Sequence, residues 1–256
     1  MSVLNTRRTL VLTAAVFLLT ISPVTAQDFR NIASFEADAY FDGEFETTLN
    51  EVFLANLTSL VTLETKIEQQ TRSDNSSTFV FLGPIFTWTP NFYTISRYGI
   101  GYHTDNNFGH EFEIDANYES QELHVGGGIR ARTYPDEDIW FIIPSLGGKI
   151  FPGERMGIRA KYFFSYNNQD QTSHALWSEA DYAVTDVVTV KLGGSGEIGD
   201  DPIDPDTAKI SYTVLTGASF KASDTVNLRY HLEYLGRVGE NYDDGIRNLI
   251  LVDWRF

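Results

Sequence analysis

The chain of 256 residues contains no cysteine, has only 19 basic residues against 35 acidic ones, and has no long apolar run after its first 26 residues. The absence of cysteine excludes disulfide bonds and thiolate metal sites, so the fold must be stable without cross-links. The formal net charge of −16 argues against nucleic acid as a partner. The short apolar runs exclude membrane-spanning helices, which need roughly 20 consecutive apolar residues.

The first residues have the pattern of a cleaved secretory signal peptide. Arg7 and Arg8 precede an apolar or neutral run from Leu10 to Ile21, and Ala26 ends a small-residue cleavage site. We therefore expect residues 1–26 to be removed and residues 27–256 to form one exported domain.

The rest of the chain alternates apolar and polar residues with a period of two, which is typical of β-strands. From Met156 to Asn167, for example, apolar side chains occupy the even positions, and most of the odd positions are polar. The pattern predicts about fourteen strands: 33–42, 47–55, 61–72, 77–88, 93–104, 108–119, 122–133, 139–151, 156–167, 173–184, 187–198, 208–221, 225–238 and 246–256. Twelve strands remain the alternative, because three of these segments (33–42, 47–55 and 77–88) alternate least regularly and barrels in one chain favour an even number.

The connections fall into two alternating sets. One set is polar, acidic and often longer: 42–46, 73–76, 105–107, 135–138, 168–171, 199–206 and 239–245. The other set is tight: 89–92, 120–121, 152–155, 185–186 and 223–224. Long outer loops and short periplasmic turns are the known asymmetry of outer-membrane barrels, and this order places both termini in the periplasm.

The last segment predicts the class of fold. Ile250, Val252, Trp254 and Phe256 alternate with more polar residues, and the chain stops on the aromatic residue. This ending resembles the C-terminal signal that barrel-assembly machinery recognises. We therefore predict an all-β protein: an antiparallel up-and-down transmembrane β-barrel of 12–14 strands in the outer membrane of a Gram-negative bacterium. The expected partners are outer-membrane lipid, lipopolysaccharide and the barrel-assembly machinery; the pattern does not predict the oligomeric state.

Aromatic residues near the strand ends support this prediction over a soluble β-sandwich, which would bury its rings in one interior. They are expected to form girdles at the two membrane interfaces: Trp88, Phe92, Tyr93, Tyr102, Tyr118, Trp140, Phe151, Tyr166, Tyr234 and Trp254.

The opposite faces of the strands predict a charged lumen. By alternation, the inward residues include Glu64, Lys66, Glu68, Glu111, Glu113, Asp115, Arg130, Arg132, Arg159, Lys161, Glu179, Asp181, Lys191, Lys209, Arg229 and Glu233. Folding the hairpin at 168–171 is expected to bring Lys161 near Glu179 and Arg159 near Asp181. Two hypotheses remain open: a water-filled conduit lined by charge, or an interior network that fills the barrel and conducts nothing.

A search for chemistry finds no catalytic or metal site. Ser173 and His174 are neighbours, but adjacent strand residues point to opposite faces and cannot share a proton as a nucleophile and its base. His103, His124 and His231 are expected to point inward, and His110 and His174 outward. The acidic loop 199–206 lacks the central glycine of a calcium loop. We therefore predict no catalytic residues, no metal and no cofactor.

Four stretches resemble the YaiO-type family of outer-membrane β-barrels. They are Arg97-Tyr98-Gly99, the run from Gly128 to Tyr134, Gly147-Gly148-Lys149, and the run from Ser173 to Trp177, and the likeness covers residues 93–200. The resemblance implies a surface-exposed barrel without catalytic residues, of a kind sometimes associated with envelope polysaccharide machinery. The leading hypothesis is thus a non-enzymatic barrel acting as a passive or polysaccharide-associated conduit. The alternatives are a surface scaffold or adhesin with a plugged barrel, and an outer-membrane lipid-modifying enzyme.

Overall fold

The structure is a computed structural model that describes residues 29–40, 45–72, 75–102, 109–134, 138–200, 208–238 and 244–255. The expected signal peptide (1–26), His103, most of the acidic loop (201–206) and Phe256 lie outside the described residues. No helix within those ranges is long and apolar enough to cross a membrane.

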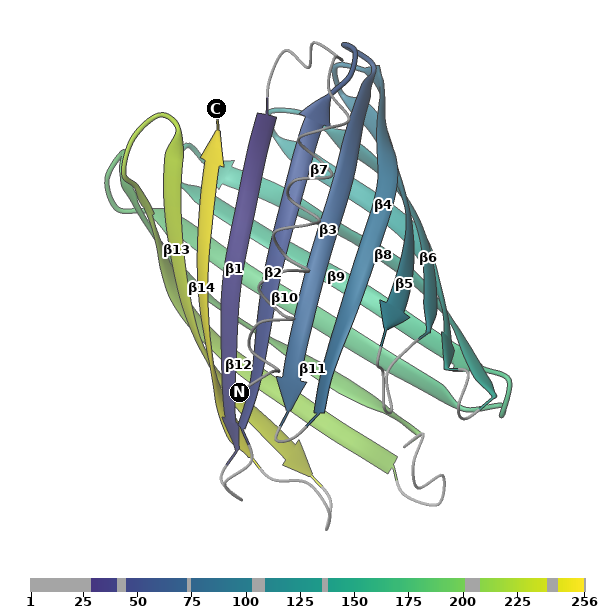
Figure 1. The fold of residues 1–256 in the computed structure, drawn as a ribbon. Coiled ribbons are helices and arrows are strands. Elements are labelled where there is room, and N and C mark those ends of the chain that lie inside the picture. The colour runs from purple at the N-terminus through teal and green to yellow at the C-terminus, as the bar shows by residue number, and fades with distance from the viewer. Residues whose placement is uncertain are drawn as a thin grey trace, which may run out of the picture.

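The described residues form fourteen antiparallel strands in one closed barrel (Figure 1). They are β1 (Phe29–Tyr40), β2 (Phe45–Asn56), β3 (Val61–Arg72), β4 (Asn75–Thr89), β5 (Phe92–Tyr102), β6 (His110–Glu119), β7 (Leu123–Tyr134), β8 (Ile139–Gly153), β9 (Met156–Asn167), β10 (Thr172–Ala183), β11 (Val188–Asp200), β12 (Ala208–Lys221), β13 (Val226–Val238) and β14 (Gly245–Arg255). The predicted all-β barrel is confirmed, with fourteen strands rather than twelve.

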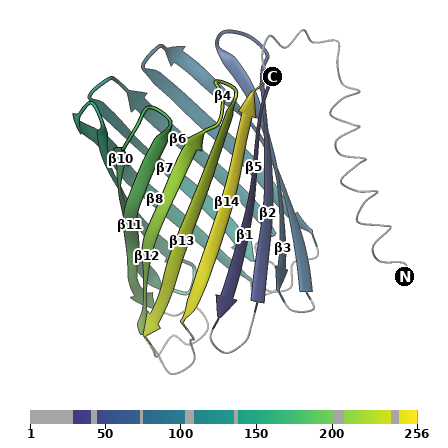
Figure 2. The ribbon, with the colours of Figure 1, turned by 90° about the vertical axis from the view of Figure 1, so that its left-hand side faces the viewer.

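The barrel closes where its first strand meets its last. β1 and β14 lie side by side in both views, and their pairing runs from Arg30 opposite Arg255 to Tyr40 opposite Gly245 (Figures 1 and 2). Each remaining strand pairs with its neighbours in sequence. Closure removes the unpaired strand edge, so the backbone amides of the wall are satisfied without water, as a hydrocarbon environment requires.

The first strand begins earlier than the alternation predicts. β1 starts at Phe29 instead of residue 33, because Arg30 is held at the barrel seam. Its Nε donates a 2.8 Å hydrogen bond to Asp253 on β14, 223 residues away. A contact this distant leaves no trace in the local pattern, from which the first strand was predicted to begin at residue 33.

The two faces of the wall differ in chemistry. Large apolar side chains stand outward at alternate positions, and Leu146 and Leu192 are 64% and 63% exposed. The intervening side chains turn inward and are shielded, with Glu111 and Glu179 only 4% and 3% exposed. An apolar belt around a polar interior is the inverse of a water-soluble protein and fits insertion in a bilayer.

The predicted aromatic girdle is largely outward-facing. Trp88, Tyr102 and Trp140 are exposed on the outer face near strand ends. Two predicted girdle residues instead face inward: the Tyr93 hydroxyl donates to Glu119 at 2.8 Å, and Phe151 packs edge-on against His124. Both predictions were wrong because these residues, although near strand ends, occupy inward positions in the alternation of their strands.

The connections at the two ends differ in length. At the end where β1 begins and β14 stops, the turns span 57–60, 90–91, 120–122, 154–155, 184–187 and 222–225. At the opposite end the strands are joined through 41–44, 73–74, 103–109, 135–138, 168–171, 201–207 and 239–244. The predicted sorting holds in part: 103–109, 201–207 and 239–244 are longer than any connection at the first end, whereas the other four connections of the second set have two or four residues, like those of the first.

Candidate functional site: the inner wall of the barrel

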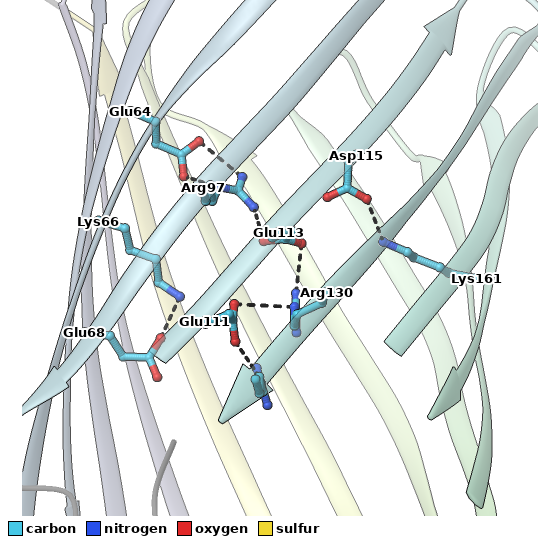
Figure 3. Close-up of polar contacts among 10 residues, drawn as sticks. Glu64, Lys66, Glu68, Arg97, Glu111, Glu113, Asp115, Arg130 and Lys161 are labelled. Carbon is cyan, nitrogen blue, oxygen red and sulfur yellow. Dashed lines mark hydrogen bonds and ion pairs between the residues drawn. The ribbon is translucent and has the colours of Figure 1, made fainter. Parts of the chain in front are cut away.

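A ladder of ion pairs crosses the inner wall from β3 to β7 (Figure 3). Arg97 on β5 reaches Glu64 on β3 at 2.7 Å and Glu113 on β6 at 2.9 Å. Arg130 on β7 contacts Glu113 at 3.0 Å. Arg97 can pass over β4 because Gly83, which has no side chain, stands opposite Glu64. The ladder thus depends on inward positions of five adjacent strands, β3 to β7.

Glu111 on β6 extends the ladder, because its two carboxylate oxygens contact two arginines of β7. This carboxylate lies 3.4 Å from Arg130 and also bonds to the Nε of Arg132. Glu111 and Glu113 are both almost fully shielded from solvent. Their negative charges are therefore stabilised by the neighbouring arginine side chains.

A second cluster occupies β8 to β11. Lys149 lies 2.7 Å from Asp181, while Glu179 lies 3.2 Å from Arg159 and 2.9 Å from Lys191. Lys161 on β9 extends to Asp115 on β6, at 3.9 Å, and so connects the second cluster to the ladder (Figure 3).

The predicted partner of Lys161 was wrong. The register places Arg159 opposite Glu179 and Trp177 opposite Lys161, two residues away from the expected alignment. The buried Asn167 fixes this register: its side-chain oxygen accepts the amide hydrogens of Gln169 and Gln171, both at 3.0 Å. Alternation specifies the face of a residue but not its partner, which the turn geometry sets. The other expected pair, Arg159 and Asp181, is present at 3.8 Å.

A third cluster lies at the seam and includes residues that the sequence analysis missed. Arg247 on β14 contacts Asp38 at 2.8 Å, Glu36 at 3.0 Å and the predicted Glu233 at 3.6 Å. Arg97 and Lys149 were missed as well. Inward parity alone would have found all three of these basic residues, since each occupies the polar face of its strand.

The remaining candidates occupy the following places. Arg229 borders a cavity of about 390 Å³ at the short-turn end of the barrel, together with Asp253. His231 lies beside the inward Gly217, and His124 borders an inner cavity, as predicted. His110 and His174 bond to the outward tyrosines Tyr98 and Tyr162.

Ser173 and His174 do not form a catalytic pair. The Ser173 hydroxyl bonds to Ser165 at 2.6 Å on the inner face, while the Nδ1 of His174 lies 2.5 Å from the Tyr162 hydroxyl on the outer face. In the described part of the chain, no group of three or more histidine, aspartate or glutamate residues could hold a metal ion. Ser173 and His174 therefore cannot act together as a nucleophile and its base.

Glycines let several inward side chains lie flat against the wall. Gly128 stands opposite Asp115, and a Cβ at Gly128 would lie only 2.2 Å from the carboxylate oxygen. Gly126 makes the same room for Asn117, and Gly217 for His231. The ion pairs given above each join strands no more than three places apart around the wall. The charged groups thus run along the wall instead of bridging the lumen.

Three cavities lie in a row along the inner face of β6 to β10 and share lining residues. The first, of about 440 Å³, is lined by Trp177 among other residues, and the second, of about 360 Å³, by Tyr134 and Phe141. A small cavity of about 10 Å³ lies between them and shares Asp115 and Lys161 with the first and Ile143 and Phe163 with the second. We call this surface the β6–β10 lane.

The lumen is filled unevenly. Phe79 and Phe81 on β4 are buried inward and pack with Tyr134 on one side. The inward positions of β10 to β12 include small residues: Ala175, Gly193, Ser195, Thr213 and Gly217.

The chain resembles known outer-membrane barrels in structure but not in sequence. No protein-family model and no curated protein matches it. A bacterial polysaccharide outer membrane secretin matches with a TM-score of 0.65 and 9% identity, over 90% of this chain and 98% of its own. An outer membrane channel from Pseudomonas putida F1 matches with a TM-score of 0.53 and 12% identity, over 90% of this chain and 95% of its own. OmpT with loop L8 deleted, an outer membrane protein of Vibrio cholerae, matches with a TM-score of 0.55 and 10% identity, over 89% of this chain and 98% of its own.

At these identities the matches establish the fold. Together with the closed barrel and its apolar outer belt, they identify the chain as an outer-membrane β-barrel, as the sequence analysis predicted.

Proposed function

We propose that this barrel is a non-enzymatic conduit that carries polar solutes across the outer membrane. The observation that carries the proposal is the flat arrangement of the inner charges. An interior network that plugged the barrel would join opposite walls, whereas the ion pairs here follow the wall and leave the cavities of the β6–β10 lane beside them. Fixed charges along a wall keep water in a pore and orient dipolar solutes.

Three narrower proposals accompany this one. The long connections face outward and both described ends of the chain face the periplasm, in line with the asymmetry of such barrels. The barrel-assembly machinery recognises the last strand, whose Ile250, Val252 and Trp254 all lie on its outer face, and lipopolysaccharide surrounds the outer half. Kinship with the YaiO-type family rests on the four short sequence stretches that resemble it.

The rival functions receive less support. The scaffold or adhesin hypothesis depends on the acidic loop, of which residues 201–206 lie outside the described residues. The lipid-modifying enzyme hypothesis depended on Ser173 and His174, which face opposite sides of the wall. A conduit is the function that the described geometry favours.

Single-channel recording in planar bilayers tests the proposal. The purified protein is expected to give discrete conductance steps. Ala175→Trp, which adds bulk on the inner wall beside the second cavity, is expected to give smaller steps. Ala218→Trp adds the same bulk to the exposed outer face of β12, so its steps should equal those of the unchanged protein.

The absence of steps from protein that migrates as a folded barrel in unheated gels would refute the conduit. Equal step sizes for the two tryptophan variants would show that the ions do not pass along the inner wall of β10.

A further inference from the structure

The β6–β10 lane has no excess of charge of either sign. Lys149, Arg159 and Lys161 lie 2.7, 3.2 and 3.9 Å from Asp181, Glu179 and Asp115, respectively. Opposite charges this close cancel within a few ångströms, and salt screens the remaining field within about 10 Å. The lane therefore neither concentrates anions nor concentrates cations.

The paired groups still face the lumen with unused hydrogen-bonding capacity. The side chains of Arg159 and Lys161 are each 36% exposed, although both lie within ion-pair distance of a carboxylate. A guanidinium has five N–H donors and a carboxylate about four acceptor sites, so one ion pair leaves several of each. The lane therefore offers both donors and acceptors to a solute.

Aromatic rings lie among these pairs. Trp177 stands opposite Lys161, and the Arg159 guanidinium is 5.6 Å from the centre of its ring. Further along the lane Phe163 follows, and Tyr134 packs edge-on against Phe141 with ring centres 5.4 Å apart. Polar groups alone would suit any hydrated ion, whereas rings interleaved with polar groups suit a molecule with both apolar faces and polar edges.

We propose that the β6–β10 lane binds uncharged glycan chains, with pyranose ring faces against the aromatic side chains and hydroxyl groups on the ion pairs. A sugar ring combines an apolar C–H face with a rim of groups that both donate and accept. A charged polysaccharide would instead compete for one member of each internal ion pair, and the other member would be left without a partner. The inference rests on the proposed function, because the glycan must enter the lumen to reach the lane.

Current block by defined hexasaccharides tests the inference. The probes are uncharged hexamers of three linkages (α-1,4-glucose, β-1,4-glucose and β-1,4-N-acetylglucosamine), a hexamer of galacturonate and a hexamer of glucosamine. At least one uncharged hexamer is expected to block the ion current at lower concentration than either charged hexamer. Titration calorimetry on the detergent-solubilised barrel measures the same binding without current.

Variants of the lane separate recognition from folding. Trp177→Ala should weaken block by the uncharged hexamer about tenfold, the loss expected for one buried aromatic contact. Trp177→Phe should recover most of this affinity, and the outward Trp140→Ala should leave it unchanged. Asp115→Asn frees the charge of Lys161 and should shift the preference toward the galacturonate hexamer.

The possible failures are distinguishable. Current steps without block, and no calorimetric binding of any uncharged hexamer, would overturn the glycan lane but leave the conduit intact. Tighter binding of a charged hexamer by the unchanged protein would overturn it as well. Absence of steps would refute the conduit, while calorimetry would still decide whether the lane binds glycan.

Discussion

Replacing Leu146 by arginine is expected to destabilise the barrel by about 2–4 kcal/mol, the cost of a basic side chain on the lipid face near the bilayer midplane. Leu146 is the central residue of β8, points outward and is 64% exposed. The preceding residue, Ser145, points inward and lines the same small cavity as Glu113 and Asp115. An arginine there stays on the polar face of the wall, near these carboxylates, so Ser145→Arg should cost less than Leu146→Arg.

Equilibrium unfolding in urea, with the barrel refolded in lipid vesicles, measures both costs. The two variants change neighbouring residues to the same side chain, so their difference reports only the direction in which each points. Equal destabilisation would contradict the assignment of the two faces.

Glu113→Gln is expected to have the second large effect, a loss of about 3 kcal/mol in the free energy of unfolding. The Glu113 carboxylate is shared by Arg97 at 2.9 Å and Arg130 at 3.0 Å. The amide keeps the size of the side chain but removes its charge, and leaves the two guanidiniums to face each other. Removing one member of a shielded ion pair costs more than the pair contributes, because the remaining charge stays desolvated.

An exposed ion pair is the control for this variant. In the turn between β12 and β13, Lys221 lies 2.7 Å from Asp224, and both side chains are open to water. The hydrogen bond from Lys221, with its positive charge, lowers the pKa of Asp224, so the pair is formed at neutral pH. Water replaces such a contact readily, and Asp224→Asn should leave the unfolding midpoint unchanged. If Glu113→Gln behaved in the same way, the inner ladder would contribute nothing to stability.

The fold was predictable from the sequence because the barrel imposes a period of two on each strand. The predicted segments 61–72, 156–167 and 208–221 coincide with β3, β9 and β12, and most others differ by one to three residues at an end. The start of β1 was not predictable, since Arg30 is stabilised by a strand at the other end of the chain.

The inner wall was predictable only in part. The alternation of inward and outward residues identified the side of the wall on which Glu113, Arg159 and Lys161 lie, but not their partners. Lys161 reaches Asp115 across two intervening strands because Gly128 and Gly147 carry no side chains there. Such a contact depends on the register of three hairpins together, and a shift in any one of them would remove it.

Water access to the middle of the inner wall tests the conduit most directly. The chain contains no cysteine, so a single introduced thiol is the only reactive site. Ser195 on β11 faces inward, and the adjacent Gly196 faces outward with open space at its Cβ position. In barrels reconstituted in lipid vesicles, a water-soluble sulfonated maleimide should modify Ser195→Cys rapidly and leave Gly196→Cys protected by lipid. An unreactive thiol at Ser195→Cys would mean a closed interior and would contradict the account.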